Sequence, residues 1–140
     1  GTMITPHFGV SISDTETQKK TNIRYTSKKN VISKETSDVM KNVLETVVSE
    51  GGGKKAAIEG YKVGAKTGTS EKLPRRSGKY IASCMGFAPA QNPKVIALVL
   101  IDEPSGIYYG GTIAAPVISK LLDDILPYVD GKEDYGYSGN

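Results

Sequence analysis

The stretch YKVGAKTGTS, residues 61–70, is the part of the sequence around which the other elements are arranged. Val63 and Ala65 would lie on one side of an extended chain, and Gly64 and Lys66 on the other. This period of two predicts a β-strand. Glycines within a strand let another backbone or a ligand approach closely. The Lys-Thr-Gly tripeptide inside the stretch is short, so its neighbours decide how much weight it carries.

Two more strands are predicted directly after this one. Residues 79–87, KYIASCMGF, and residues 94–103, KVIALVLIDE, are separated by a turn that contains two prolines. Residues 95–101 form an apolar run, which is typical of a strand buried on both faces. The short links between the three strands favour an antiparallel meander.

Two helices are predicted on either side of these strands. Residues 33–50 begin with Ser33 as N-cap and end at three glycines. Their apolar residues form one stripe that we expect to be core: Val39, Met40, Val43, Leu44, Val47 and Val48. The second helix would run from a cap at Thr112 to about Leu126, with Pro127 ending it. The pattern predicts an α+β fold in which an antiparallel sheet of three main strands packs against two helices.

The first thirty residues are less regular. In residues 3–13, alternating apolar residues predict a short half-buried strand. Residues 14–30 are polar and basic, which predicts a solvated loop or an exposed hairpin. His7 is the only histidine, and we expect it to be structural or exposed.

The composition narrows the function classes. The chain has 140 residues, 38% hydrophobic and 24% charged, as expected for one domain with a real core. A net charge of +3 and a single Tyr in the basic run give no support for nucleic-acid binding. No apolar run reaches the ~18 residues of a membrane span, and the first residues do not form a signal peptide. We expect any membrane anchor of the parent protein to lie outside this chain.

The single cysteine, Cys84, excludes an intrachain disulfide and a paired-cysteine zinc site. Its place in a strand predicts a buried, inert thiol. We expect no metal and no cofactor.

Lys66, Thr67, Gly68, Thr69 and Ser70 combine a positive charge with hydroxyl donors and space for a ligand. On an exposed sheet edge, such a strand suits an extended anionic peptide that binds by strand addition. One of its backbone N–H groups would serve as half of an oxyanion hole. The alternative is a polar edge strand whose lysine guards against aggregation.

Residues 31–126 resemble the C-terminal part of the transpeptidase domain of class B penicillin-binding proteins, most closely the division and sporulation type. The matching stretches are VISKETSDVMKNVLETVVSEGGG, GYKVGAKTGTSEK, YIASCMGFAP, KVIALVLIDEP and YYGGTIAAPV. The opening MITPHF is also similar to that family. The resemblance implies that residues 1–129 are the C-terminal portion of such a domain, part of a penicillin-binding and β-lactamase-like fold. Residues 130–140 would be a polar tail or linker.

The resemblance also implies roles for these residues. Lys66 would hold a hydroxyl network and the anionic substrate, and the hydroxyls of Thr67 and Thr69 would bind the terminal carboxylate of a D-Ala-D-Ala stem peptide or a β-lactam. The backbone N–H of Thr69 would form half of the oxyanion hole, with Gly68 and Ser70 completing the substrate-binding strand. The family reaction cross-links peptidoglycan through a serine ester at the extracytoplasmic face of the bacterial membrane.

The family's nucleophile motif, Ser-x-x-Lys, does not occur in residues 1–140, and Ser-x-Asn occurs only at residues 138–140, in the polar tail. We expect both functional motifs upstream, in the remainder of the domain, and we expect this chain to be inactive alone. In the family the strand that matches residues 95–101 pairs with a strand absent here. We expect another copy, a second chain carrying the rest of the domain, or a rearrangement to cover it.

Two other functional hypotheses remain. A serine β-lactamase or β-lactam sensor domain would also carry the Lys-Thr-Gly strand, but the long apolar strand and the YYGGTIAAPV stretch favour the transpeptidase. The missing nucleophile motif favours a non-catalytic binding module for the chain as it stands.

Overall fold

The structure is a computed structural model that describes residues 1–131. The polar tail predicted for residues 130–140 therefore lies, from residue 132 on, outside the described residues. The elements follow one another as β1 (Met3–Ile4), β2 (Ser11–Ser13), β3 (Lys20–Asn22), β4 (Ser27–Lys28), α1 (Lys34–Ser49), η1 (Lys54–Ala56), β5 (Gly64–Glu71), β6 (Tyr80–Ala88), β7 (Val95–Asp102), α2 (Gly110–Ile113) and α3 (Ala115–Val129). No helix within residues 1–131 has the length and apolar character needed to cross a bilayer.

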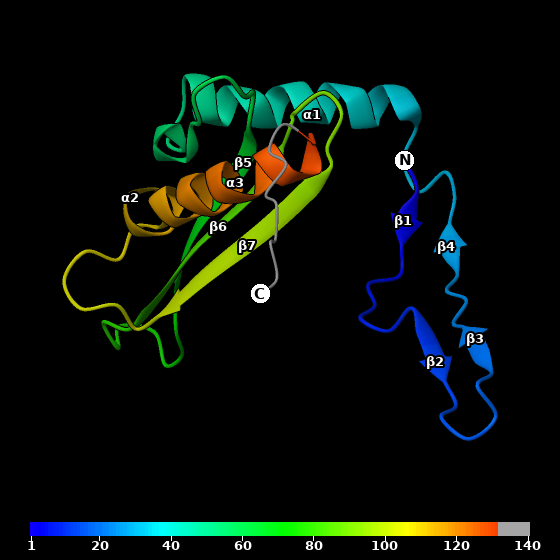
Figure 1. Cartoon of the computed structure of the whole chain (residues 1–140). Coiled ribbons are helices and arrows are strands. Elements are labelled where there is room, and N and C mark those ends of the chain that lie inside the picture. Colours follow the sequence, from blue (N-terminus) through cyan, green and yellow to red (C-terminus); the bar gives the residue numbers. More distant parts are fainter. Residues whose placement is uncertain (132–140) are drawn as a thin grey trace, which may run out of the picture. The chain divides into compact units, whose positions relative to one another are not determined.

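The chain divides into two compact units, Gly1–Asp38 and Val39–Asn140. The first unit is a ribbon in which β1 pairs with β4 and β2 with β3, both antiparallel (Figure 1). Residues 14–30, expected to be a solvated loop or an exposed hairpin, contain the turn and the returning strands β3 and β4 of this ribbon, and all of them except Ile23 are exposed. At this turn, Asp14 Oδ1 accepts hydrogen bonds from the N–H groups of Glu16 (2.9 Å) and Thr17 (3.1 Å), and these bonds hold the pKa of Asp14 below its ordinary value.

A half-buried strand was predicted in residues 3–13. This prediction is wrong, because the apolar side chains of this segment are exposed. Val10 is 71% and Ile12 64% exposed, because a two-stranded ribbon has no second layer to cover them. His7 is exposed, as expected, and its ring stacks on Tyr25 with centroids 3.8 Å apart.

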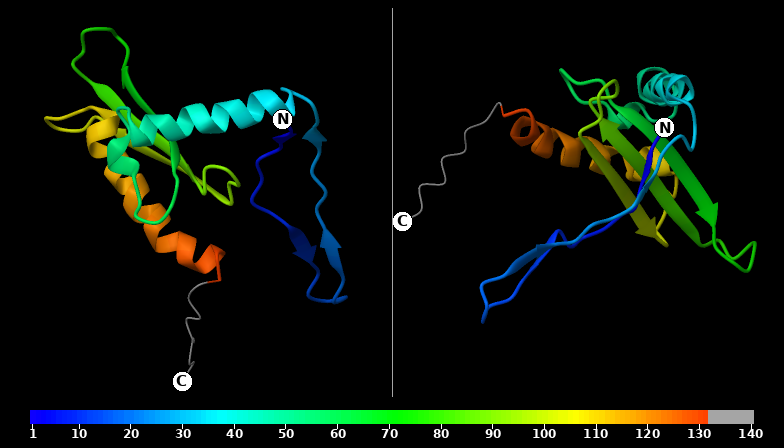
Figure 2. Two further views of the ribbon diagram at one scale, coloured as in Figure 1. Left: turned by 90° about the horizontal axis from the view of Figure 1, so that it is seen from above. Right: turned by 90° about the vertical axis from the view of Figure 1, so that its right-hand side faces the viewer.

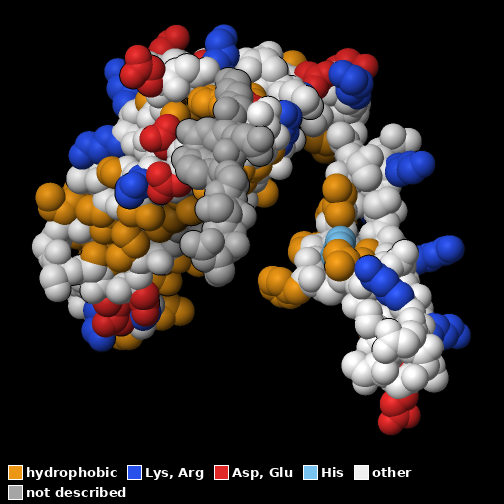
Figure 3. All heavy atoms as spheres, in the orientation of Figure 1, with side chains coloured by type: hydrophobic (Ala, Val, Ile, Leu, Met, Phe, Trp, Pro, Cys, Tyr) orange, Lys and Arg blue, Asp and Glu red, His pale blue; other side chains and the backbone are white. Residues whose placement is uncertain are grey.

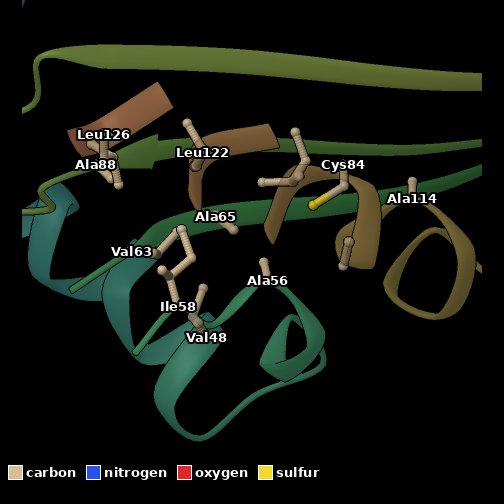
Figure 4. Close-up of a cluster of buried hydrophobic side chains, with 12 residues drawn as sticks. Val48, Ala56, Ile58, Val63, Ala65, Cys84, Ala88, Ala114, Leu122 and Leu126 are labelled. Atoms are coloured by element: carbon tan, nitrogen blue, oxygen red, sulfur yellow. The ribbon is translucent and has the colours of Figure 1, made fainter. Parts of the chain in front are cut away.

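The second unit contains an antiparallel sheet in the order β5–β6–β7, as predicted. Helix α3 lies across one face of this sheet, which two views show (Figures 1 and 2). The core is the layer between α3 and the sheet, closed by the end of α1 and by η1 (Figure 4). On its outer side, α3 keeps Val117 and Leu121 at the surface, and hydrophobic side chains gather over this helix (Figure 3).

Small residues on β6 let α3 pack close to the sheet. Ala82, Cys84 and Ala88 share the face that α3 covers, and each is fully buried. A Cβ added to Gly86 on this face would lie 2.4 Å from Ile118 Cγ2. The burial predicted for Cys84 is confirmed, and burial raises the pKa of its thiol, although the charge of Lys66 opposes this shift.

Helix α1 begins as predicted, because the Thr36 N–H donates to Ser33 Oγ at 3.1 Å. Its apolar stripe differs from the prediction. Val48 is buried, but Val39 is 58% and Val43 49% exposed. In the described part of the chain, the core includes Val48 in the last turn of α1, whereas Leu44 and Val47 are only partly buried.

The second predicted helix is divided, and both of its predicted ends are wrong. Thr112 lies inside α2, and α3 starts only after Ala114. Pro127 does not end α3, which continues to Val129. The buried Leu126 fixes the last turn to the core, and its carbonyl accepts the N–H of Asp130 at 2.9 Å.

Strand β7 is an edge strand, and it is not buried on both faces. Val95, Ala97, Val99 and Ile101 are partly buried against the core. The opposite face exposes the alternate residues: Ile96 by 68%, Leu98 by 62% and Leu100 by 63%. The sequence run is apolar on both sides, but α3 covers only one of them.

Candidate active-site strand

The five residues from Lys66 to Ser70 lie on β5, whose hydrogen-bonded neighbour in the described sheet is β6 alone. Alternation places Lys66, Gly68 and Ser70 on the face opposite α3, and Thr67 and Thr69 on the α3 face. Lys66, Thr69 and Ser70 are exposed. The structure therefore brings all five predicted site residues to one open strand.

The peptide groups of β5 alternate in direction, and the contacts of Gly110 show which ones face outward. A Cβ added to Gly110 would lie 2.4 Å from the carbonyl oxygen of Gly68 and 2.2 Å from that of Ser83. Both oxygens therefore point into the space between β5 and β6. In an antiparallel ladder, the residues on either side of such a pair point their N–H and C=O groups away. Thr67 and Thr69 thus direct their backbone groups to the free edge.

Lys66 reaches the same edge. Its Nζ donates a hydrogen bond to the carbonyl oxygen of Thr67 at 2.6 Å. The ammonium group is exposed, so its charge is accessible to an anion that approaches the strand.

Gly68 has no room for a side chain, because Ser83 on β6 occupies the space beside it. A Cβ at Gly68 would lie 2.6 Å from Ser83 Oγ. The register pairs these two residues directly across the ladder. Ser83 therefore adds a hydroxyl group between Lys66 and Ser70, on their face of the sheet. The sequence did not point to Ser83, because no motif in residues 79–87 marks it.

Two glycines bring the chain before α3 onto the predicted site. The Gly110 N–H donates to Thr69 Oγ1 at 3.2 Å. A Cβ on Gly111 would lie 2.4 Å from the Gly52 carbonyl oxygen and 3.6 Å from Thr67 Cγ2. The glycine loop after α1, the start of α2 and the Lys-Thr-Gly strand therefore meet at one point. The stretch YYGGTIAAPV was noted in the sequence only as part of a resemblance.

Three tyrosines cluster near the far end of the same strand. Tyr80, which pairs with Glu71 at the end of β5, stacks on Tyr108 with ring centroids 4.0 Å apart. The ring centroids of Tyr108 and Tyr109 lie 4.7 Å apart, and a side-chain hydrogen bond from Tyr108 raises the pKa of Tyr109. Tyr109 directly precedes Gly110, so the cluster holds the loop that delivers Gly110 to Thr69. The spacing of these tyrosines in the sequence gave no signal of the cluster.

The connector between β5 and β6 is fixed by ion pairs. Lys72 Nζ lies 2.9 Å from Asp102 Oδ1 and 2.8 Å from Glu103 Oε1, and Lys79 Nζ lies 3.1 Å from Glu103 Oε2. The hydrogen bonds from Lys72 and Lys79 lower the pKa of Glu103, and those to Glu103 and Asp102 raise the pKa of Lys72. Two of the connector's basic residues are therefore held by carboxylates.

Among residues 1–131, no three side chains of His, Cys, Asp or Glu converge as they would around a metal ion. The chemistry of the strand is instead that of hydrogen-bond donors and one ammonium group at an open edge.

Comparison with known families shows which family the chain belongs to. The sequence matches the penicillin binding protein transpeptidase domain over residues 1–123. The chain belongs to this family. The resemblance to class B penicillin-binding proteins is thereby confirmed.

Several relatives of this transpeptidase chain are known by name. Stage V sporulation protein D of Bacillus subtilis (strain 168) is 43% identical over 134 residues, which cover 91% of this chain and 20% of that protein. Peptidoglycan D,D-transpeptidase FtsI of Escherichia coli (strain K12) is 45% identical over 90 residues, covering 61% of this chain and 15% of that protein. Relatives from sporulation and from the FtsI group thus both match. This chain spans about a fifth of the length of the curated relatives it matches.

Solved structures confirm the partial fold. The transpeptidase domain of Burkholderia pseudomallei penicillin-binding protein 3 aligns with a TM-score of 0.64 at 36% identity, over 84% of this chain and 35% of that one. The D,D-transpeptidase domain of a peptidoglycan glycosyltransferase from Eggerthella lenta aligns with a TM-score of 0.68 at 27% identity, over 89% of this chain and 27% of that one. The predicted antiparallel sheet with two helices is therefore the corresponding part of a transpeptidase domain.

Proposed function

We propose that this chain forms the substrate-docking wall of a peptidoglycan D,D-transpeptidase. The observation that carries the proposal is the free edge of β5, where Thr67 and Thr69 present outward backbone groups beside the exposed Lys66 ammonium. Family membership supports a stem peptide ending in D-Ala-D-Ala, or a β-lactam, as the ligand.

Binding follows from the chemistry of that edge. An extended peptide adds to an open strand through main-chain hydrogen bonds. Its terminal carboxylate would accept hydrogen bonds from the hydroxyls of Thr67 and Thr69, and Lys66 would supply the opposite charge. The outward N–H of Thr69 would stabilise the oxyanion that forms when the substrate carbonyl is attacked. Gly68 and Ser70 keep the rest of the strand narrow and polar.

Acyl transfer also needs a nucleophile, and we propose that it comes from the remainder of the domain. No Ser-x-x-Lys sequence occurs in residues 1–140, and Ser138 in the Ser-x-Asn match lies outside the described residues. The substrate-docking wall and the serine would then face one another across a cleft, at the extracytoplasmic face of the membrane.

Fluorescent penicillin tests both parts of the proposal. The chain alone should remain unlabelled, and covalent label on it would contradict our placement of the nucleophile. In the full-length protein, Lys66→Ala should abolish labelling, whereas Lys62→Ala, a lysine exposed just before β5, should retain it. Equal labelling of these two variants would contradict the role of the strand.

A further inference from the structure

The hydroxyl group of Thr69 has one hydrogen-bond partner that the fold fixes. The backbone N–H of Gly110, 41 residues away, donates to Thr69 Oγ1 at 3.2 Å. A threonine hydroxyl has one proton to donate and two lone pairs that accept. Because Gly110 occupies an acceptor position, the proton of Thr69 remains available for another group. Thr69 is exposed and Gly110 is buried, so that other group comes from the solvent side.

This contact has little freedom to shift. A Cβ on Gly110 would lie 2.2 Å from the Ser83 carbonyl oxygen, so the backbone at Gly110 is in direct contact with the sheet. On the other side, a Cβ on Gly111 would lie 2.4 Å from the carbonyl oxygen of Gly52. The Gly110 N–H is therefore held between the sheet and the glycine loop, and it points at one atom of Thr69.

As a consequence, the Thr69 hydroxyl is set to donate its hydrogen bond toward the solvent side. A hydrogen bond accepted by an O–H group strengthens the bond that the group donates. A carboxylate offers acceptors only, so it matches such a donor. A terminal carboxamide carries an NH₂ group that needs an acceptor, and Gly110 already competes for the lone pairs of Thr69.

We propose that the Gly110 N–H is a positioning group that makes Thr69 select a terminal carboxylate over a carboxamide. The inference rests on the proposed function, since it assumes that a peptide docks along β5. It adds a specificity-determining contact from Gly110, the first residue of α2, which acts on the ligand through Thr69.

The test is an NMR titration of the ¹⁵N-labelled 140-residue chain. One titrant is an N-acylated D-Ala-D-Ala dipeptide with a free carboxylate, and the other is the same dipeptide with a C-terminal carboxamide. We expect the carboxylate form to move the amide resonances of both Thr69 and Gly110. The carboxamide should bind at least about tenfold more weakly, as expected for the loss of a charge-assisted hydrogen bond.

Two variants of Thr69 separate the hydroxyl from the shape of the side chain. Thr69→Val keeps the shape and should reduce the preference for the carboxylate, leaving the part that comes from the charge of Lys66, and it should abolish the response of the Gly110 amide. Thr69→Ser keeps the hydroxyl and should retain both. Gly110→Ala pushes the N–H away from Thr69 and should also reduce the preference, while the resonances of β7 stay in place as a check on folding.

The outcomes distinguish this inference from the proposed function. Suppose that the carboxylate peptide moves the resonances of Lys66–Ser70. If Thr69→Val then keeps the full preference of the unsubstituted chain, or if the Gly110 amide does not respond in the unsubstituted chain, the role of Gly110 is wrong and the docking strand stands. If neither peptide moves these resonances, the proposed docking strand itself is wrong.

Discussion

At the scale of single residues, Gly111 shows how little space separates the glycine loop from the candidate site. A Cβ there would lie 2.4 Å from the Gly52 carbonyl oxygen, which is backbone and cannot swing away. We expect Gly111→Ala to destabilise the chain by about 1–3 kcal/mol, the usual range for overpacking. Urea unfolding followed by circular dichroism measures this change.

Gly52→Ala is the matched control on the other side of the same contact. Nothing lies within 4 Å of a Cβ added at Gly52, so this substitution should cost much less than Gly111→Ala. Equal losses in the two variants would mean that the loop moves to accept either methyl group, which contradicts the close contact.

The ion pairs of Glu103 predict a dependence on pH. Contacts with Lys72 and Lys79 hold the pKa of Glu103 below its ordinary value of 4.5. A lowered carboxyl pKa stabilises the fold above that value, and the contribution is lost as the pH falls through the lower pKa of the folded state. Lys72, whose pKa is raised above 10.5, remains charged throughout this range.

We therefore expect Glu103→Gln to lower the melting temperature at pH 7, with the difference from the unsubstituted chain shrinking below pH 4.5. Glu59→Gln, at an exposed position before β5, changes the net charge by the same amount and serves as control. A difference for Glu103→Gln that stays constant down to pH 3 would show that the ion pairs are not its cause.

At the scale of elements, the attachment of α3 to the sheet depends on one side of the helix. Leu122 is fully buried, whereas its neighbour Leu121 is 39% exposed. Leu122→Ala should cost about 2–5 kcal/mol, the range for a core leucine. Leu121→Ala makes the same chemical change and should cost less than about 1 kcal/mol. Thermal unfolding of both variants measures the two losses of stability. Similar losses would contradict this assignment of the buried and exposed faces of α3.

The sequence predicted the strands well because their signal is local. The run before Glu103 and the alternation around Lys66 place β7 and β5 within a few residues of their observed bounds. The ends of α3 were missed, because Leu126 in the core holds the turn that Pro127 was expected to break.

The candidate site was predictable only in part. A short motif in one strand is visible in the sequence, and it placed Lys66 and Thr69 on an open edge. The groups that position them come from distant segments. Gly110 meets Thr69 across 41 residues, and Ser83 meets Gly68 through strand register. No local pattern encodes either contact, so both required the structure.

At the scale of the whole molecule, the open side of β7 is the feature that we expect to promote association of the isolated chain. Ile96, Leu98 and Leu100 are each more than 60% exposed along an edge strand whose outer backbone groups are unpaired within the described sheet. Such strands promote association between chains. We retain the prediction that this strand is covered in the functional protein, by the remainder of the domain, a second copy or a rearrangement.

A charge on this strand should therefore keep the isolated chain soluble. Leu98→Lys places an ammonium group at the centre of the exposed row, where it opposes edge-to-edge pairing. Light scattering at increasing concentration should show less association than in the unsubstituted chain. Asn92→Lys adds the same charge in the exposed turn before β7 and should change association little. If both lysines reduce association equally, net charge is the cause and β7 is not the associating surface. If neither does, the chain associates through another surface, or the strand is already covered in solution.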